Sequence, residues 1–243
     1  MRVLVTRASP SAEKTAARLA ALGHTPVLLS LARAIHDQAA TKAALENAKG
    51  ALVVTSAEAL RSLEALPVSA IHTLVYAVGE ATAKAARTAG FLNVRAAEGT
   101  GLSLAALIAK DLKGADQIVP LTYLAGSPRS PDLEATLAAD GIALDVVEAY
   151  RMEAIEPDAF ALDALLEHPP EAVLVYSQES ALRFFRLPAV SAHPDRFSQT
   201  LFACISEKAA SAVPPRFSDM IRIAEAPDEA ALLKLLPHPS SQI

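Results

Sequence analysis

Short apolar runs alternate with alanine-rich stretches along this chain, and the two kinds of segment predict different elements. Most of the apolar runs are continuous rather than alternating with polar residues, which is typical of strands buried on both faces of a parallel sheet. We expect strands at 3–5, 27–29, 52–54, 73–78, 118–119, 146–147, 173–175 and 201–205.

The stretches between these runs have helical period and end at glycines. Helices are expected at 12–22, 81–89 and 132–140, followed by Gly23, Gly90 and Gly141. A glycine just after the last periodic residue is a common helix stop. Alternating strands and helices indicate an α/β protein with little antiparallel structure.

The sequence also repeats itself. Residues 73–83 align with 200–210, residues 54–58 with 175–179, and residues 18–23 with 136–141, where Ser9-Pro10 meets Ser127-Pro128. The matches are collinear and keep their turn residues in register, which favours a duplication. The duplication alone suggests halves at 1–116 and 117–243.

Composition narrows the class of protein. Hydrophobic residues are 52% of the 243 residues, and 22 basic against 27 acidic residues give a net charge of −5. A nucleic-acid binder should show a basic surplus, so we expect no nucleic-acid partner. We also expect no membrane span, because no long uncharged apolar run occurs, and a cytoplasmic location, because Arg7 and Glu13 interrupt the region where a secretory signal would be apolar.

Familiar catalytic signatures are missing. There is no phosphate-binding P-loop and no nucleophile elbow, and Gly99-Thr100-Gly101 lacks the third glycine of a dinucleotide fingerprint, so it indicates a turn. The histidines lack metal-ligand spacing, and the single cysteine, Cys204, lies inside an apolar strand. We therefore expect no metal site and a core role for Cys204.

Small polar residues gather instead where the predicted strands end. In open α/β sheets ligands bind at that edge, and helix N-termini there favour anions. Each hydroxyl has an alternative role as a helix cap, and each arginine as a salt-bridge partner of a nearby acid. The candidate binding residues are Arg7, Thr55, Ser56, Gly79, Thr82, Gly126, Ser127, Arg129, Ser177, Ser180 and Ser206.

These motifs, in this order, resemble the uroporphyrinogen-III synthase family over essentially the whole chain. The resemblance is carried by Val3-Leu-Val-Thr-Arg7, Leu52-Val-Val-Thr-Ser56-Ala57, Tyr76-Ala-Val-Gly79-Glu-Ala-Thr82-Ala, Tyr123-Leu-Ala-Gly126 with Arg129, Leu133-x-x-x-Leu137-x-x-x-Gly141 and Val146-Val-Glu-Ala-Tyr150-Arg151. The chain departs from the family at Ser206-Glu207-Lys208-Ala209, which lacks the glycine and threonine of that turn. Any role of a hydroxyl at Ala209 is thereby lost.

The resemblance implies a fold that differs from the simple halves. It implies two flavodoxin-like parallel-sheet lobes that are joined by a two-stranded β-ladder and segment-swapped, each lobe forming one face of a cleft. Lobe one would be 1–30 with 156–243, lobe two 36–145, and the linker strands 31–35 and 146–155.

The resemblance also implies a reaction. The substrate would be a linear hydroxymethyl tetrapyrrole with eight carboxylates, which loses its hydroxyl as water and closes with inversion of the terminal ring in haem biosynthesis. The enzyme would be a cofactor-independent lyase that mainly orients the chain ends. Tyr150 matches the family's tyrosine at the end of the linker strand and is the candidate acid for the departing hydroxyl; its alternative role is a packing aromatic.

Partners and competing functions follow from the same interpretation. We expect a monomer whose partner is the tetrapyrrole, with the preceding deaminase as a candidate for substrate handover. Two α/β lobes also occur in cytoplasmic proteins that bind a polyanion without catalysis, and in sugar-nucleotide transferases. A transferase should carry a dedicated nucleotide site, and the sequence shows none.

Overall fold

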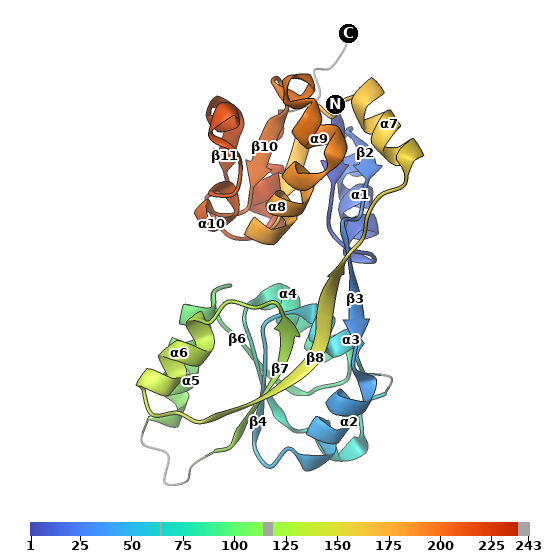
Figure 1. Ribbon diagram of the computed structural model, residues 1–243. Coiled ribbons are helices and arrows are strands. Elements are labelled where there is room, and N and C mark those ends of the chain that lie inside the picture. Colours follow the sequence, from blue (N-terminus) through green and yellow to red (C-terminus); the bar gives the residue numbers. More distant parts are fainter. Residues whose placement is uncertain (64, 114–118, 238–243) are drawn as a thin grey trace. The chain divides into compact units, whose positions relative to one another are not determined.

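The computed structural model describes residues 1–63, 65–113 and 119–237, and the chain forms two compact units. Unit 1 is Met1–Arg33 with Glu153–Ile243, and unit 2 is Ala34–Met152 (Figure 1). The boundaries fall within strands β3 (Ala32–His36) and β8 (Leu144–Ala154), so the chain passes between the units twice. Each unit contains one sheet, and the predicted α/β class with parallel sheets in two lobes is confirmed.

Unit 1 has a five-stranded parallel sheet in the order β11-β10-β9-β1-β2. In chain order this is 2-1-3-4-5, the flavodoxin-like arrangement. Its strands are β1 (Arg2–Val5), β2 (Thr25–Leu28), β9 (Ala172–Val175), β10 (Leu201–Cys204) and β11 (Ile221–Ile223). Its helices are α1 (Ser11–Ala21), α7 (Ala159–Glu167), α8 (Gln178–Arg186), α9 (Pro188–Ala192), α10 (Glu207–Ala210) and α11 (Glu229–Leu233), with 3₁₀ turns at Pro194–Phe197 and Pro215–Met220.

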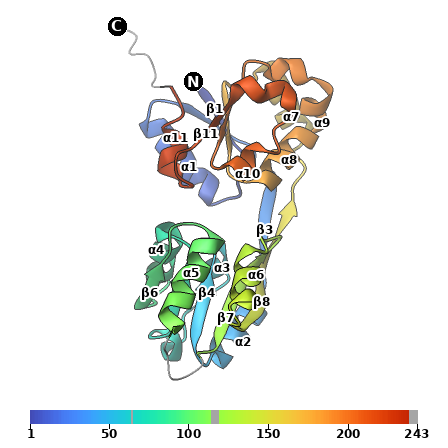
Figure 2. The same ribbon diagram turned by 90° about the vertical axis from the view of Figure 1, so that its left-hand side faces the viewer.

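Unit 2 has a six-stranded sheet in the order β3-β8-β7-β4-β5-β6. Besides β3 and β8, its strands are β4 (Ala51–Val54), β5 (Leu74–Ala77), β6 (Asn93–Ala96) and β7 (Leu121–Ser127). Its helices are α2 (Gln38–Asn47), α3 (Ala57–Arg61), α4 (Glu80–Thr88), α5 (Gly101–Leu112) and α6 (Asp132–Ala139), with a 3₁₀ turn at Val68–Ala70. The helices α5 and α6 lie side by side on one face of the sheet (Figures 1 and 2).

The two sheets have the same arrangement with a permuted chain order, as the resemblance implies. The simple halves at 1–116 and 117–243, which the internal repeat alone suggests, are wrong, because β1 and β2 pair in the sheet of β9, β10 and β11. The segment β7-α6-β8 corresponds to β1-α1-β2, and β4, β5 and β6 correspond to β9, β10 and β11. Sheet order alone therefore superimposes β8-β7-β4-β5-β6 on β2-β1-β9-β10-β11. Segments that match in the sequence repeat therefore occupy equivalent positions in the two sheets.

The core repeats this correspondence position by position. In unit 1, Leu19 of α1 packs with Leu232 of α11 over Val3 and Leu174. In unit 2, Leu137 of α6 packs with Leu104 of α5 over Leu121 and Val53. All of these side chains are buried. Each unit thus places two helices over equivalent strands, and only in unit 1 are these helices distant in the chain.

The predicted helix ends and the predicted core position of Cys204 agree with the structure. The three predicted helices end at Gly23, Gly90 and Gly141, which all have positive φ, the conformation that favours glycine at a helix end. Cys204 is fully buried, and burial raises the pKa of its thiol to about 12, in keeping with a core role.

The strand predicted at 118–119 is wrong. Ile118 lies outside the described residues, Val119 is not in a strand, and the strand begins at Leu121, just after Pro120. Proline has no N–H to donate to a ladder, so Pro120 precedes the strand instead of joining it. The strands β6 and β11 were not predicted; both lie at sheet edges, where polar residues such as Arg95 and Arg222 interrupt the apolar pattern.

Candidate active site

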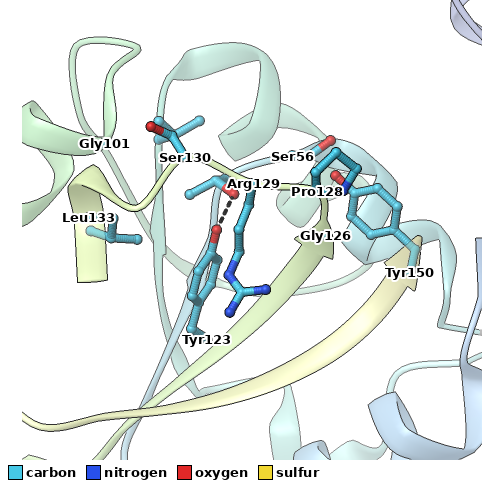
Figure 3. A pocket seen from close by; sticks show the side chains of 11 residues that line it. Ser56, Gly101, Tyr123, Gly126, Pro128, Arg129, Ser130, Leu133 and Tyr150 are labelled. Carbon is cyan, nitrogen blue, oxygen red and sulfur yellow. Dashed lines mark hydrogen bonds between the residues drawn. The ribbon is translucent and has the colours of Figure 1, made fainter. Parts of the chain in front are cut away.

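A cavity of about 190 Å³ lies at the carboxyl ends of β4 and β7 in unit 2 (Figure 3). The strand order reverses between these two neighbours, because β5 and β6 continue from β4 while β8 continues from β7. Open α/β sheets bind ligands at such a switch point. The lining residues are Thr55, Ser56, Val78, Gly101, Tyr123, Gly126, Pro128, Arg129, Ser130, Leu133 and Tyr150.

A bulge in β8 delivers Tyr150 to this cavity. Ala125 of β7 pairs with Glu148, but the next residue, Gly126, pairs with Tyr150, so Ala149 is the additional residue. Side chains alternate along a strand, and an additional residue moves every later side chain to the opposite face. Val146 packs on the α5–α6 face, whereas Tyr150 packs on the other face beside Ala149.

Gly126 makes room for the Tyr150 ring. A Cβ atom placed on Gly126 would lie 2.7 Å from Tyr150 Cε1 and closer still to Cζ and the hydroxyl oxygen, which is nearer than atoms can approach. The glycine is therefore required for the tyrosine to lie against the end of β7, as Figure 3 shows. Gly126 and Tyr150, each predicted separately as a site residue, lie together at this cavity.

The environment of Tyr150 keeps its phenol protonated. Burial raises the pKa of Tyr150 above its ordinary value, and this outweighs the lowering effect of a hydrogen bond with Ser56. A protonated phenol is a hydrogen-bond donor throughout the neutral range. Ser56 also accepts a hydrogen bond from Glu58 N at 3.1 Å and so caps α3.

Tyr123 reaches the same cavity from the opposite face of the sheet and was not among the predicted site residues. Val53 pairs with Tyr123, so Thr55, two residues further along β4, stands diagonally ahead of the ring on the same face. The Tyr123 hydroxyl lies 2.7 Å from Thr55 Oγ1 (Figure 3). Burial raises the pKa of Tyr123 as well. Its only sequence signal was its place in the motif ending at Gly126.

Arg129 brings positive charge to the cavity, partly balanced by a neighbour. Its guanidinium donates to both carboxylate oxygens of Glu134, at 2.5 and 3.3 Å. Both side chains are about one-third exposed. The ion pair is the alternative that the sequence left open for Arg129, and the residue nevertheless lines the cavity.

Three predicted residues of unit 2 do not line the cavity. Gly79 precedes α4, where its Cα faces Gly99 closely enough that an added Cβ would lie 3.2 Å from it. Thr82 is buried within α4, and Ser127 ends β7. Glu80, beside them, is exposed and forms an ion pair with Arg87 at 2.6 Å.

In unit 1, the predicted Arg7 belongs to a cluster around a carboxylate from α11. Arg7 lies 3.2 Å from Glu229 Oε1, and its guanidinium carbon stands 4.1 Å from the centre of the Tyr176 ring. The Tyr176 hydroxyl donates to Glu229 at 2.7 Å, and Thr15 and Arg18 contact the same carboxylate. No local pattern pointed to Glu229, because it is distant from the other members in the chain.

The predicted serines of unit 1 serve as helix caps. Ser177 accepts from Ser180 N at 3.0 Å, and Ser180 Oγ accepts from Ser177 N at 3.1 Å, which forms a capping box at the start of α8. Ser206 accepts from Ala209 N at 3.3 Å and caps α10. These bonds realise the alternative role of each hydroxyl.

Within the described residues, no three His, Cys, Asp or Glu side chains gather where they could hold a metal ion. Across the same part of the chain, every helix is too short or too polar to cross a bilayer.

Comparison with known proteins identifies solved structures that resemble this chain. No curated protein sequence matches significantly. A mutant uroporphyrinogen III synthase from the extremely thermophilic bacterium Thermus thermophilus is 18% identical, with 96% of each chain covered and a TM-score of 0.57. Uroporphyrinogen-III synthetase from Helicobacter pylori is 17% identical, with 96% of each chain covered and a TM-score of 0.58. These two structures share the fold.

The family comparison extends over nearly the whole sequence. Residues 13–234 match the family described as uroporphyrinogen-III synthase HemD. This range includes the switch-point cavity, the bulge that delivers Tyr150 and the Glu229 carboxylate. The chain belongs to the uroporphyrinogen-III synthase family.

Proposed function

We propose that this chain cyclises a linear hydroxymethyl tetrapyrrole with loss of water and inversion of the terminal ring. The family match over residues 13–234 supports this reaction. The observation in the structure that supports it best is the Tyr150 phenol, held in an open cavity at the switch point of unit 2. No observation favours the non-catalytic binding protein over the enzyme.

Tyr150 is the proposed acid. As the C–O bond of the hydroxymethyl group breaks, the phenol donates its proton to the departing oxygen, and water leaves. The pyrrole nitrogen supplies the electron pair and forms the azafulvene. Because the net reaction releases only water, ring closure returns one proton, and the phenol is restored. The pKa of Tyr150 is raised, so the group is protonated before each turnover.

The rest of the cavity would bind and orient. Thr55, Ser56 and Ser130 offer hydroxyls, and Arg129 offers charge. At about 190 Å³ the cavity is smaller than the roughly 300–1,000 Å³ that encloses a drug-sized ligand, so it would hold one arm of the substrate. The assignments of Arg7, Gly79, Thr82, Gly126, Ser127, Ser177, Ser180 and Ser206 to substrate binding remain predictions.

Other aspects of the function are also predictions. They are the cytoplasmic location, the monomeric state and the handover of substrate from a deaminase. None is needed for the proposed chemistry, which depends on Tyr150 and the cavity of unit 2.

The test is turnover of the linear tetrapyrrole by the wild-type protein, with the product isomers separated. The inverted isomer should form faster than spontaneous closure gives the uninverted one. If the protein bound the linear substrate yet left the ratio of isomers at its spontaneous value, the non-catalytic alternative would replace the enzyme.

A further inference from the structure

The two units share one sheet order and the internal sequence repeat, so several positions of the unit 2 cavity have counterparts in unit 1. In unit 1 the first residue of α11 is Glu229, preceded by the cap Asp228. In unit 2 the first residue of α5 is Gly101, preceded by the cap Thr100. Leu232 and Leu104, three residues further along each helix, are both fully buried against equivalent strands. Glu229 and Gly101 are therefore counterparts.

The other members of the Glu229 cluster also have counterparts at the cavity. Tyr176 follows β9 as Thr55 follows β4, and Thr15 of α1 stands where Leu133 stands in α6. Tyr176 and Thr15 both contact the Glu229 carboxylate. Gly101, Thr55 and Leu133 all line the cavity of unit 2. The same place in the fold is thus filled by a carboxylate in unit 1 and open in unit 2.

The chemistry around the two places is also alike. In unit 1 the carboxylate receives hydroxyl hydrogen bonds and lies beside two arginines. In unit 2 the hydroxyl pair of Thr55 and Tyr123 and the Arg129 side chain line the open space, while the Ser130 hydroxyl donates to Asp132 at 2.7 Å. Glu134, the acid that pairs with Arg129, does not line the cavity.

We propose that the cavity of unit 2 is a subsite for one carboxylate on a short aliphatic arm of the substrate, bound where Gly101 leaves the place that Glu229 fills in unit 1. The identity of the substrate rests on the proposed function, but the carboxylate preference rests on the comparison of the two units. The hydrogen-bonded pair of Thr55 and Tyr123 would donate its one remaining hydroxyl hydrogen to the carboxylate, and Arg129 would supply charge.

The first test fills the cavity with a carboxylate of the chain itself. Gly101 has no positive φ, and a Cβ added to it would make only ordinary contacts, the nearest 3.4 Å from Leu133 N. Gly101→Glu should fold and place its carboxylate as Glu229 does. We expect KM for the tetrapyrrole to rise at least about tenfold, the size of one lost charge-assisted hydrogen bond.

One variant controls for the added charge. Leu102→Glu adds the same charge at the next residue, whose side chain is 58% exposed and outside the cavity lining. Leu102→Glu should keep KM within about twofold of wild type. Equal increases in KM for Gly101→Glu and Leu102→Glu would overturn the proposal, because the effect would then be general repulsion of a polyanion.

The second test does not depend on catalysis. Propionate is titrated into the wild-type protein while backbone amide resonances are followed by NMR, with propionamide as the neutral control. The amide signals of Gly101 and Ser130 should shift with propionate and should not shift with propionamide. In Gly101→Glu, the Ser130 signal should no longer respond to propionate.

The outcomes of this titration separate the subsite from the reaction. Absence of any propionate shift in the wild type would overturn the subsite, even if the enzyme is active. Inactivity together with a normal propionate shift would overturn the proposed reaction and leave the subsite standing.

Discussion

At the scale of single residues, the proposed role of Tyr150 as general acid depends on its hydroxyl group. Tyr150→Phe keeps the ring against Gly126 and removes only the hydroxyl. General acid groups contribute about 10²–10⁴-fold, and an activated hydroxymethylpyrrole needs less help, so kcat should fall by the low end of that range or less. KM should change little, because the hydrogen bond strengthens as the hydroxyl leaves. Steady-state kinetics at several pH values would measure both.

The raised pKa of Tyr150 adds a pH criterion to this prediction. Because the phenol stays protonated beyond its ordinary value of about 10, the ratio of wild-type to variant kcat should be constant through the neutral range. Tyr76→Phe is the matched control, since Tyr76 is a buried tyrosine whose pKa burial also raises and which does not line the cavity. Full activity of Tyr150→Phe would remove Tyr150 from the mechanism.

Glu229 makes a second prediction at this scale, concerning stability. Burial raises its pKa, but hydrogen bonds from Thr15 and Tyr176 and the charges of Arg7 and Arg18 outweigh burial and lower the pKa below 4.5. A lowered carboxyl pKa stabilises the folded state above the unfolded pKa, and this stabilisation is lost as pH falls through the folded pKa. Glu229→Gln should therefore lower the free energy of unfolding by about 1–3 kcal/mol at pH 7, because it weakens hydrogen bonds to a charged group.

The measurement is urea unfolding of wild type and Glu229→Gln between pH 7 and pH 3. The difference in the free energy of unfolding should shrink as the carboxyl of the wild type becomes protonated. Glu46→Gln is a suitable control, because Glu46 is an exposed carboxylate that lies 3.9 Å from Lys42 on the same helix. A difference that stays constant down to pH 3 would contradict the ionised role of Glu229.

At the scale of elements, Ser177 can be tested as a cap or as a ligand. It caps α8 through Ser180 N, and aspartate caps as well as serine does. Ser177→Ala should lower the free energy of unfolding by about 1 kcal/mol, whereas Ser177→Asp should keep it. If Ser177 also binds a substrate carboxylate, Ser177→Asp should raise KM by charge repulsion; an unchanged KM would leave it a cap alone. Thermal unfolding and steady-state kinetics of both variants supply the two readouts.

The elements also show how far the sequence could predict the fold. Buried parallel strands such as 3–5 and 52–54 carry their pattern in consecutive residues, and glycine stops mark helix ends, so these were predicted correctly. The edge strand β11 alternates Ile221, Arg222 and Ile223, and its pairing with β10 depends on tertiary contacts. A local pattern could not reveal it.

The sequence could predict only part of the site. Thr55, Ser56, Gly126, Arg129 and Tyr150 line one cavity, because β4, β7 and β8 are successive strands of the sheet and these residues lie in or just after them. The side that Tyr150 faces depends on the bulge at Ala149, and period-two alternation gives the opposite side. Tyr123 reads as a core residue until its hydroxyl is seen beside Thr55.

At the scale of the whole molecule, duplication followed by divergence accounts for the distribution of chemistry. The two units keep the same sheet order and the same packing of two helices over it. They differ at the switch point, where unit 1 has Glu229 and unit 2 has Gly101. At this place unit 1 has a network of ion pairs around Glu229, and unit 2 has a cavity that Thr55 and Arg129 line.

Each unit also has its own hydrophobic clusters, and this leads to a prediction about cooperativity. The clusters of unit 1 and of unit 2 share no residue across the boundary within the described part of the chain. Leu232 and Leu104 are counterparts, both fully buried, so Leu232→Ala and Leu104→Ala form a matched pair.

Truncating a buried leucine lowers the free energy of unfolding by about 2–5 kcal/mol. A domain with its own core can unfold by itself. Native-state hydrogen exchange should show each variant losing protection in its own unit, with the slowest amides of the other unit unchanged. If either variant lowered the protection of both units equally, the molecule would unfold as one cooperative body, and the separation of the two cores would have no thermodynamic consequence.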